Sequence, residues 1–148
     1  MSRPSSSLGA LALAGLAAAV LATPVGAATK DPDGRYRGSL TADLAIDSGP
    51  VSFKVSRDGR RLSGWKATFT AVCNYDPYVM TVTVTLPTTT IKRDGRFRGA
   101  VRTTRDGKPL KLTVSGRLRG TRVTGGVIDY DIGSCTRKNP WTAKRTGR

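Results

Sequence analysis

Two carboxylates one residue apart are the part of this sequence with the clearest capacity for chemistry. Asp129 and Asp131 flank Tyr130 in the segment GVIDYDI. Because successive side chains of a β-strand point to opposite faces, a strand here places both carboxylates on one side, where they could bind calcium or form an acid/base pair. Such pairs more often lie on the outside of a sheet, beside neighbouring arginines, and this is what we expect.

The remaining composition offers little else for catalysis. The chain has no histidine, and all ten acidic residues are aspartate. Without histidine, a Ser-His-Asp triad and histidine metal sites are excluded. Most aspartates are assigned to turns, because they precede glycine or proline; these are Asp31, Asp33, Asp58, Asp76, Asp94 and Asp106. We expect a protein that is not an enzyme, with no catalytic, metal-binding or cofactor-binding residue.

The two cysteines predict one disulfide between Cys73 and Cys135. A reactive thiol is the alternative, but it needs a nearby base or a helix dipole to lower its pKa, and neither is visible in the sequence. Closing so long a loop should stabilise the fold by on the order of 4 kcal/mol.

The amino terminus has the parts of a secretory signal peptide. Arg3 is followed by a mildly apolar run at 8–22 and then by small residues, so cleavage is expected after Ala27 or Ala28. The alternative is an uncleaved anchor. The sequence therefore predicts a signal peptide at 1–28 and a single secreted β domain at 29–148, with no transmembrane segment in the mature chain.

Hydrophobic residues alternate with polar ones through most of the mature chain, as in half-buried strands. Low helix propensity agrees with this, since glutamate and glutamine are absent and threonine, valine and glycine are common. The predicted strands cover 36–46, 51–56, 65–73, 80–86, 97–102, 110–118, 128–132 and 141–145. The phase slips at Ser63-Gly64 and at Gly125-Gly126, which predicts β-bulges there.

The tripeptide RDG occurs at Arg57, Arg93 and Arg105. Asp-Gly favours a type I′ hairpin turn, because glycine accepts a positive φ. The fold class is therefore all-β: about eight antiparallel strands in a meander, forming a small barrel or a two-sheet sandwich. Trp65 and Trp141 are expected in the core, with sugar stacking as the alternative.

The pattern Gly-Arg-apolar-Arg-Gly occurs three times, at Gly34, Gly95 and Gly116. The first two copies follow Asp-Gly turns and should start strands whose aromatic residue points inward. The third should end a strand, with the following RGTR as the turn. We interpret the pattern as a consequence of the apolar–polar alternation of strands, and not as a repeat or a nucleic-acid-binding segment.

The formal net charge is +15, and the signal peptide carries only Arg3 of it. A field of this sign attracts polyanions, and the expected partners are anionic cell-envelope polymers: teichoic acid, anionic lipid or an acidic glycan. No specific nucleic acid recognition is expected. The candidate polyanion-binding residues are Arg35, Arg37, Arg96, Arg98, Arg102, Lys111, Arg117, Arg119 and Arg122.

Two alternatives stay open. In one, the arginines serve only solubility. In the other, the domain is a β-barrel carrier with a small ligand in its mouth, which would require a cavity above about 300 Å³. Bulky inward residues such as Phe53, Trp65, Phe69, Met80 and Phe97 could instead fill the barrel.

Several segments carry a resemblance: VSFKVSRDGRRLSG, IKRDGRFRG, LTVSGRLRGTRVTG, and GSC followed by WTAKR. Together with YRG after an export signal, they make the chain similar to a group of uncharacterised small secreted β-rich proteins of high-GC Gram-positive bacteria. The resemblance implies a disulfide-linked β domain of unknown function. We expect the mature protein outside the cell, with association with the cell wall as a further hypothesis. The segment NYDPYVM departs from the group, where a more glycine-rich connection is expected.

Overall fold

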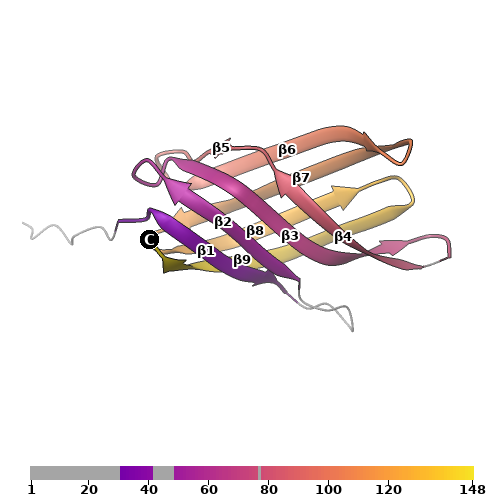
Figure 1. Ribbon diagram of the computed structural model, residues 1–148, viewed down its shortest axis with the longest axis horizontal. Coiled ribbons are helices and arrows are strands. Elements are labelled where there is room, and N and C mark those ends of the chain that lie inside the picture. Colours follow the sequence, from indigo (N-terminus) through magenta and orange to yellow (C-terminus); the bar gives the residue numbers. More distant parts are fainter. Residues whose placement is uncertain (1–30, 42–48, 77) are drawn as a thin grey trace, which may run out of the picture.

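The computed structural model describes residues 31–41, 49–76 and 78–148, which form an all-β fold (Figure 1). The signal peptide predicted at 1–28, with its cleavage after Ala27 or Ala28, lies outside the described residues. So does the part of the first predicted strand beyond Thr41. No helix in the described ranges is long and apolar enough to cross a membrane.

Nine strands follow one another in the described part of the chain, and all their pairings are antiparallel. They are β1 Gly34–Leu40, β2 Pro50–Ser56, β3 Arg61–Cys73, β4 Val79–Leu86, β5 Thr89–Thr90, β6 Arg96–Arg105, β7 Lys108–Arg119, β8 Arg122–Asp131 and β9 Cys135–Gly147. The predicted fold class is confirmed, and the two-residue strand β5 is an addition to it.

The strands form one sheet in the order β4-β3-β2-β1-β9-β8-β7-β6. It consists of two four-stranded meanders joined where the first and last strands pair, and Figure 1 shows β1 beside β9 at this junction. The carboxyl end of β3 also pairs with the start of β9, and β5 pairs with β3. These extra pairings bend the sheet so that it partly closes a ring.

The side chains that face the interior are large and mostly apolar. Trp65 and Trp141 are both fully buried, as predicted. The Trp141 ring lies 5.9 Å from Phe53, 6.1 Å from Trp65 and 6.1 Å from Phe97, measured between ring centroids. Such edge and tilted contacts stabilise a core beyond the area that they bury. The aromatic residues of both meanders therefore meet in a single core.

The three Gly-Arg-apolar-Arg-Gly segments behave as predicted. Tyr36 and Phe97 are buried near the starts of β1 and β6, and the arginines on either side of each are exposed. Leu118 is buried near the end of β7, and a two-residue turn at Gly120-Thr121 leads into β8. The same sequence pattern thus starts two strands and ends a third.

Both predicted bulges are present. The register of β2 with β3 shifts between Ser52 and Lys54, opposite Gly64, which has a φ of 60°. The register of β8 shifts against both of its neighbours around Gly125, whose φ is 58°. Only glycine adopts this left-handed conformation without strain, so the glycines at these two positions allow the bulges.

The three RDG segments form three different turns. Asp106 and Gly107 have φ values of 49° and 73° and make the predicted two-residue hairpin between β6 and β7. The copy at Arg57 also joins paired strands, β2 and β3, but through the longer turn 57–60. The copy at Arg93 does not make a hairpin, so that prediction is wrong. It joins β5 to β6, which pair with β3 and β7 respectively, because the chain crosses here from one meander to the other.

The last strand is longer than predicted, and Cys135 begins it instead of lying in a connection. The inward positions of its first half are taken by Arg137 and Asn139, which are buried although polar. The Asn139 amide donates a hydrogen bond to the backbone carbonyl of Thr41 at 2.6 Å. Because these residues break the apolar alternation, the sequence pattern shows only the second half of β9.

The predicted disulfide is confirmed. Cys73 and Cys135 are directly opposite one another where the end of β3 meets the start of β9, and they are bonded. The bond links the two meanders at a point where only a short ladder joins them. It therefore supports the closure of the ring.

Candidate functional site

The aspartate pair on β8 lies on the outer face of the sheet. Asp129 pairs in register with Lys138 of β9, and Asp131 pairs with Lys111 of β7. One carboxylate oxygen of Asp131 accepts the Gly133 N–H at 2.7 Å. Each carboxylate thus has a cation on a neighbouring strand, as expected for a surface pair. Among the described residues, no three histidine, cysteine or acidic side chains are grouped to hold a metal ion.

Tyr130 points the other way, into the core. Its ring packs edge-on against Phe69 with centroids 5.5 Å apart, and burial raises the pKa of its hydroxyl. Because it faces away from Asp129 and Asp131, the three side chains do not converge on one point. The arrangement offers no acid/base centre on this strand.

The cations are distributed unevenly between the two ends of the molecule. We call the end with the turns 57–60, 92–95 and 120–121 the basic end, and the end with the disulfide and the β6–β7 hairpin the disulfide end. In Figure 1 the carboxyl terminus marks the basic end, and the β3–β4 and β6–β7 connections lie at the opposite side. The two ends carry different arrangements of charge.

A row of cations crosses four strands near the basic end. Arg119 of β7 pairs with Arg122 of β8, Arg122 with Lys144 of β9, and Lys144 with Arg37 of β1. All four side chains are exposed. We call these four residues the cationic row. On the far side of Arg37, Ser52 and then Lys66 continue the same register.

Hydroxyl groups lie beside the cationic row, one step along the strands. Ser39 of β1 pairs with Thr142 of β9, and Thr124 lies in the β8 bulge next to them. A surface hollow is lined by Ser39, Thr124 and Thr142 together with Arg37, Arg122 and Lys144. No acidic side chain contributes to this lining. We call it the first hollow.

A second hollow adjoins the first and shares Thr124 with it. Its cationic lining comes from Lys92, Arg96, Arg98 and Arg117. At the bulge between β7 and β8, Gly125 has no side chain to fill this hollow, and a Cβ added there would meet nothing within 4 Å. The two hollows form a basic strip on the outer face, running from β1 across β9, β8 and β7 to β6.

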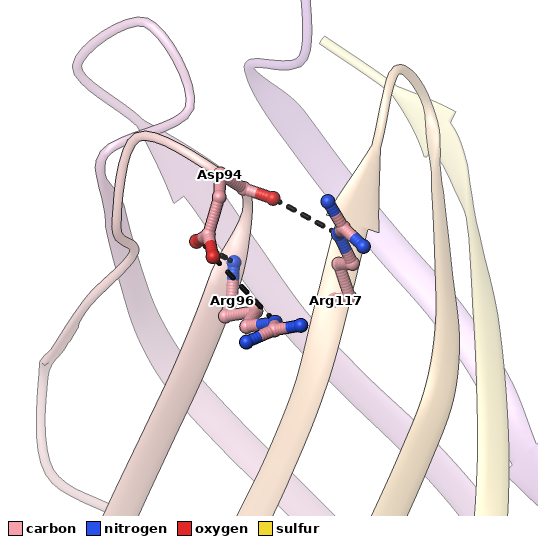
Figure 2. Close-up of polar contacts among 3 residues, drawn as sticks. All are labelled: Asp94, Arg96 and Arg117. Atoms are coloured by element: carbon pink, nitrogen blue, oxygen red, sulfur yellow. Dashed lines mark hydrogen bonds and ion pairs between the residues drawn. The ribbon is translucent and has the colours of Figure 1, made fainter.

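Asp94 anchors two arginines of the second hollow (Figure 2). Its carboxylate accepts the backbone N–H of Arg96 at 3.0 Å and lies 3.5 Å from the Arg96 Nε. The backbone N–H bond is the main cause of its lowered pKa. Arg117 instead donates its Nε to the Asp94 backbone carbonyl at 3.0 Å. The Asp94 carboxylate thus forms an ion pair with Arg96, and the Asp94 backbone carbonyl holds the Arg117 side chain in place.

The structure separates the nine predicted cations into two sets. The larger set lies toward the basic end, on or beside the strip: Arg35, Arg37, Arg96, Arg98, Arg117, Arg119 and Arg122. Arg102 and Lys111 pair with each other nearer the disulfide end, and Lys111 also pairs with Asp131. These two line another hollow together with Asp129 and Asp131, and it adjoins the strip at Arg98.

Sequence reasoning missed Lys144, which lies in the middle of the cationic row. The alternation of Trp141 and Ala143 does place Lys144 on the outside. Its position between Arg122 and Arg37 follows only from the pairing of the first strand with the last, which the alternation does not contain.

The carrier alternative needs an internal cavity. In the described part of the chain, the inward side chains make close ring contacts, including a stacked pair of Tyr36 and Phe53 with centroids 5.0 Å apart. The two hollows of the strip lie on the outer face. Inside, however, Trp65 Nε1, Trp141 Nε1 and Arg137 Nε are buried without a hydrogen-bond partner among the described residues, so the carrier stays an alternative prediction.

Comparison with models of known protein families, with curated proteins and with solved structures finds no match. The chain is a small all-β protein with one disulfide. Any function must therefore be argued from its surface.

Proposed function

We propose that this protein is a secreted, non-enzymatic β domain that binds anionic polymers of the cell envelope through its basic strip. Teichoic acid, anionic lipid and acidic glycans are the candidate partners. The signal-peptide features of residues 1–28 and the resemblance to small secreted β-rich proteins of high-GC Gram-positive bacteria support the extracellular location. The cationic row carries the proposal.

Like charges placed directly opposite one another on neighbouring strands destabilise a sheet. Lys144 has such a neighbour on each side, Arg122 and Arg37, and no acidic residue takes part in the row. Neighbouring strands are about 4.8 Å apart, well within the screening length at physiological salt. A polyanion lying across these strands would offset the repulsion. Polyanion binding would therefore explain the like-charge neighbours, which strand pairing alone does not explain.

Recognition of this kind is electrostatic and does not read a nucleotide sequence. The strip belongs to the outer face of a sheet, and its exposed side chains are cations and hydroxyls. Base-specific binding uses an element inserted into a groove or a platform of stacking aromatic side chains. The expected ligand is therefore a repeating anion rather than a particular sequence.

The test is retention of the mature protein on immobilised teichoic acid, heparin and a neutral glycan across a salt series. We expect retention on the two anionic polymers that falls steeply with salt, because binding releases counterions. The neutral glycan should retain nothing. Absence of retention on every polymer at about 0.15 M salt would leave solubility as the role of the arginines.

A matched pair of variants locates the binding surface. The triple variant R37Q/R122Q/K144Q removes three charges from the strip, and R102Q/K111Q/K138Q removes three from the region of the disulfide end. We expect the first to weaken binding roughly 150-fold, at about 1 kcal/mol per cation. The second should change binding less than about threefold, at a few tenths of a kcal/mol per remote charge. Equal losses of affinity in the two variants would mean that binding depends on the net charge of the protein and not on the strip.

A further inference from the structure

We infer that the first hollow selects tetrahedral oxyanions, phosphate or sulfate esters, over carboxylates. This deepens the proposed function and depends on it, because it names the chemical class of the polymer that the strip would hold. The inference comes from the hydroxyl groups beside the cations, which a purely electrostatic surface does not need.

The donors of the hollow form a grid of two rows on three strands. One row has Arg122, Lys144 and Arg37 on β8, β9 and β1, and the other has Thr124, Thr142 and Ser39 on the same strands. Neighbouring strands are about 4.8 Å apart, and side chains two residues apart on a strand are about 6.6 Å apart. A group lying over the grid can thus receive hydrogen bonds from several directions.

The hydroxyl groups of this grid are available to a ligand. Thr124 and Thr142 are exposed, as is Ser39, and no hydrogen bond joins any of these hydroxyls to another described residue. The hydroxyls of Thr68 and Thr83, by contrast, bond to each other across β3 and β4 at 2.9 Å. Threonines on the outer face therefore do not all present a free donor.

The shape of the anion decides which ligand uses such a grid best. A carboxylate has two oxygens in one plane, and the planar fork of one arginine can satisfy both. A phosphate diester or a sulfate ester has its charged oxygens arranged around a tetrahedron, so its acceptors point in directions that do not share one plane. Ammonium, guanidinium and hydroxyl donors from three strands suit the second geometry.

The second hollow extends the same chemistry along the polymer. It shares Thr124 with the first hollow and adds Arg98, Arg117 and the Ser115 hydroxyl. Successive anionic groups of one chain can therefore occupy neighbouring hollows, with the polymer running across the strands. A free phosphate ion would bind one hollow at a time and more weakly.

The experiment compares two polymers of matched length and number of charges, polyphosphate and poly-glutamate, as competitors for the protein bound to immobilised poly(glycerol phosphate). We expect polyphosphate to displace the protein at a concentration at least about fivefold lower, the equivalent of one neutral hydrogen bond. If the two compete equally, the inference fails and the proposed function stands. If the protein does not bind the immobilised polymer but is retained on heparin, the inference fails and the proposed function stands. If neither polymer retains it, both fail.

A pair of hydroxyl variants tests the grid without changing any charge. T124V/T142V removes two hydroxyls of the first hollow, and T81V/T104V removes two exposed hydroxyls elsewhere on the outer face. We expect T124V/T142V to reduce the preference for polyphosphate to less than about twofold while leaving competition by poly-glutamate unchanged. T81V/T104V should behave as the unmodified protein. An unchanged preference in T124V/T142V would overturn the role of the hydroxyls.

Discussion

The two ends of this small sheet arrange their cations differently. Near the disulfide end, Lys111 and Lys138 each pair with an aspartate, Asp131 and Asp129, although Lys111 also pairs with Arg102. Near the basic end, Lys144 has arginine neighbours on both sides. Aspartates occur at both ends, and Asp58 and Asp94 lie in turns of the basic end. What distinguishes the basic end is that no aspartate pairs with the cationic row, so four like charges lie side by side across four strands.

The ends also differ in their apolar surface and in what secures them. The large hydrophobic side chains exposed among the described residues all lie on the β3–β4 hairpin, beside the disulfide: Val72, Tyr75, Tyr78 and Val79. The Lys108 ammonium lies over the Tyr75 ring, 4.7 Å from its centroid. This end is held by a covalent bond and mixed contacts, whereas the basic end depends on strand pairing and on the core beneath it.

Removal of the disulfide should give the largest effect. The double variant C73A/C135A opens a link across 62 residues, and we expect it to lose on the order of 4 kcal/mol of unfolding free energy. Denaturant unfolding measures the loss. Polymer binding at a temperature where the variant is still folded should be unchanged, because the bond is at the other end. A parallel loss of binding would show that the two ends are coupled.

Alkaline pH should produce the next largest loss of stability. The Tyr36 hydroxyl donates to the backbone carbonyl of Pro32 at 2.6 Å, and burial raises its pKa to about 12. Because the folded state holds the neutral form, this stabilisation is complete below about pH 10, the ordinary tyrosine pKa. It is lost as the pH rises toward 12.

Unfolding free energies measured across this pH range test the effect, with Y36F as the variant that removes the titration. Y36F should lose less unfolding free energy at alkaline pH than the unmodified protein. The pKa of Tyr130 is also raised by burial, so Y130F is the matched change nearer the disulfide end. A profile that is the same in Y36F and in the unmodified protein would assign the alkaline loss to other groups.

Two glycine variants should separate stability from binding. Gly107 and Gly125 have φ values of 73° and 58°, and an added Cβ would meet nothing within 4 Å at either position. G107A and G125A should therefore each cost about 1–2 kcal/mol through backbone strain alone. Only G125A changes the bulge under the strip, so only it should weaken polymer retention. Equal retention in the two variants would show that the bulge does not shape the site.

The smallest effect expected is a change in unfolding free energy. Substitution of two lysines of β9 should change it in opposite directions. K144T relieves repulsion from Arg37 and Arg122 and should raise the unfolding free energy by about 0.2–1 kcal/mol at low salt. K138T removes the neighbour of Asp129 and should lower it by a similar amount. Thermal unfolding at low and high salt measures both changes, which salt should reduce. Stabilisation by both variants would remove the contrast between the ends.

Much of the fold was predictable because the side-chain alternation of a strand is local. Tyr36, Phe53 and Phe97 alternate with exposed cations, and their inward direction follows from that period. The Asp106-Gly107 hairpin follows from the conformations that these two residues tolerate. The Arg93 turn and the first half of β9 were missed, because one crosses between meanders and the other buries Arg137 and Asn139.

The candidate site was predictable only in part. Alternation places Arg37, Arg122 and Lys144 on the outer face, but it does not say that they are neighbours, since they belong to strands far apart in the chain. The same reasoning grouped Arg102 and Lys111 with them, although both lie nearer the disulfide end.

The sequence by itself determined most of the strands, the Asp-Gly hairpin, the disulfide partners and the outward direction of the candidate arginines. Those features depend on φ preferences and on a two-residue period, which act over a few residues. Only the tertiary structure decided that β1 pairs with β9, and with it the cationic row and the hydroxyls beside it. Pairing between the first and last strands depends on how the whole core closes, and that is a property of the complete chain.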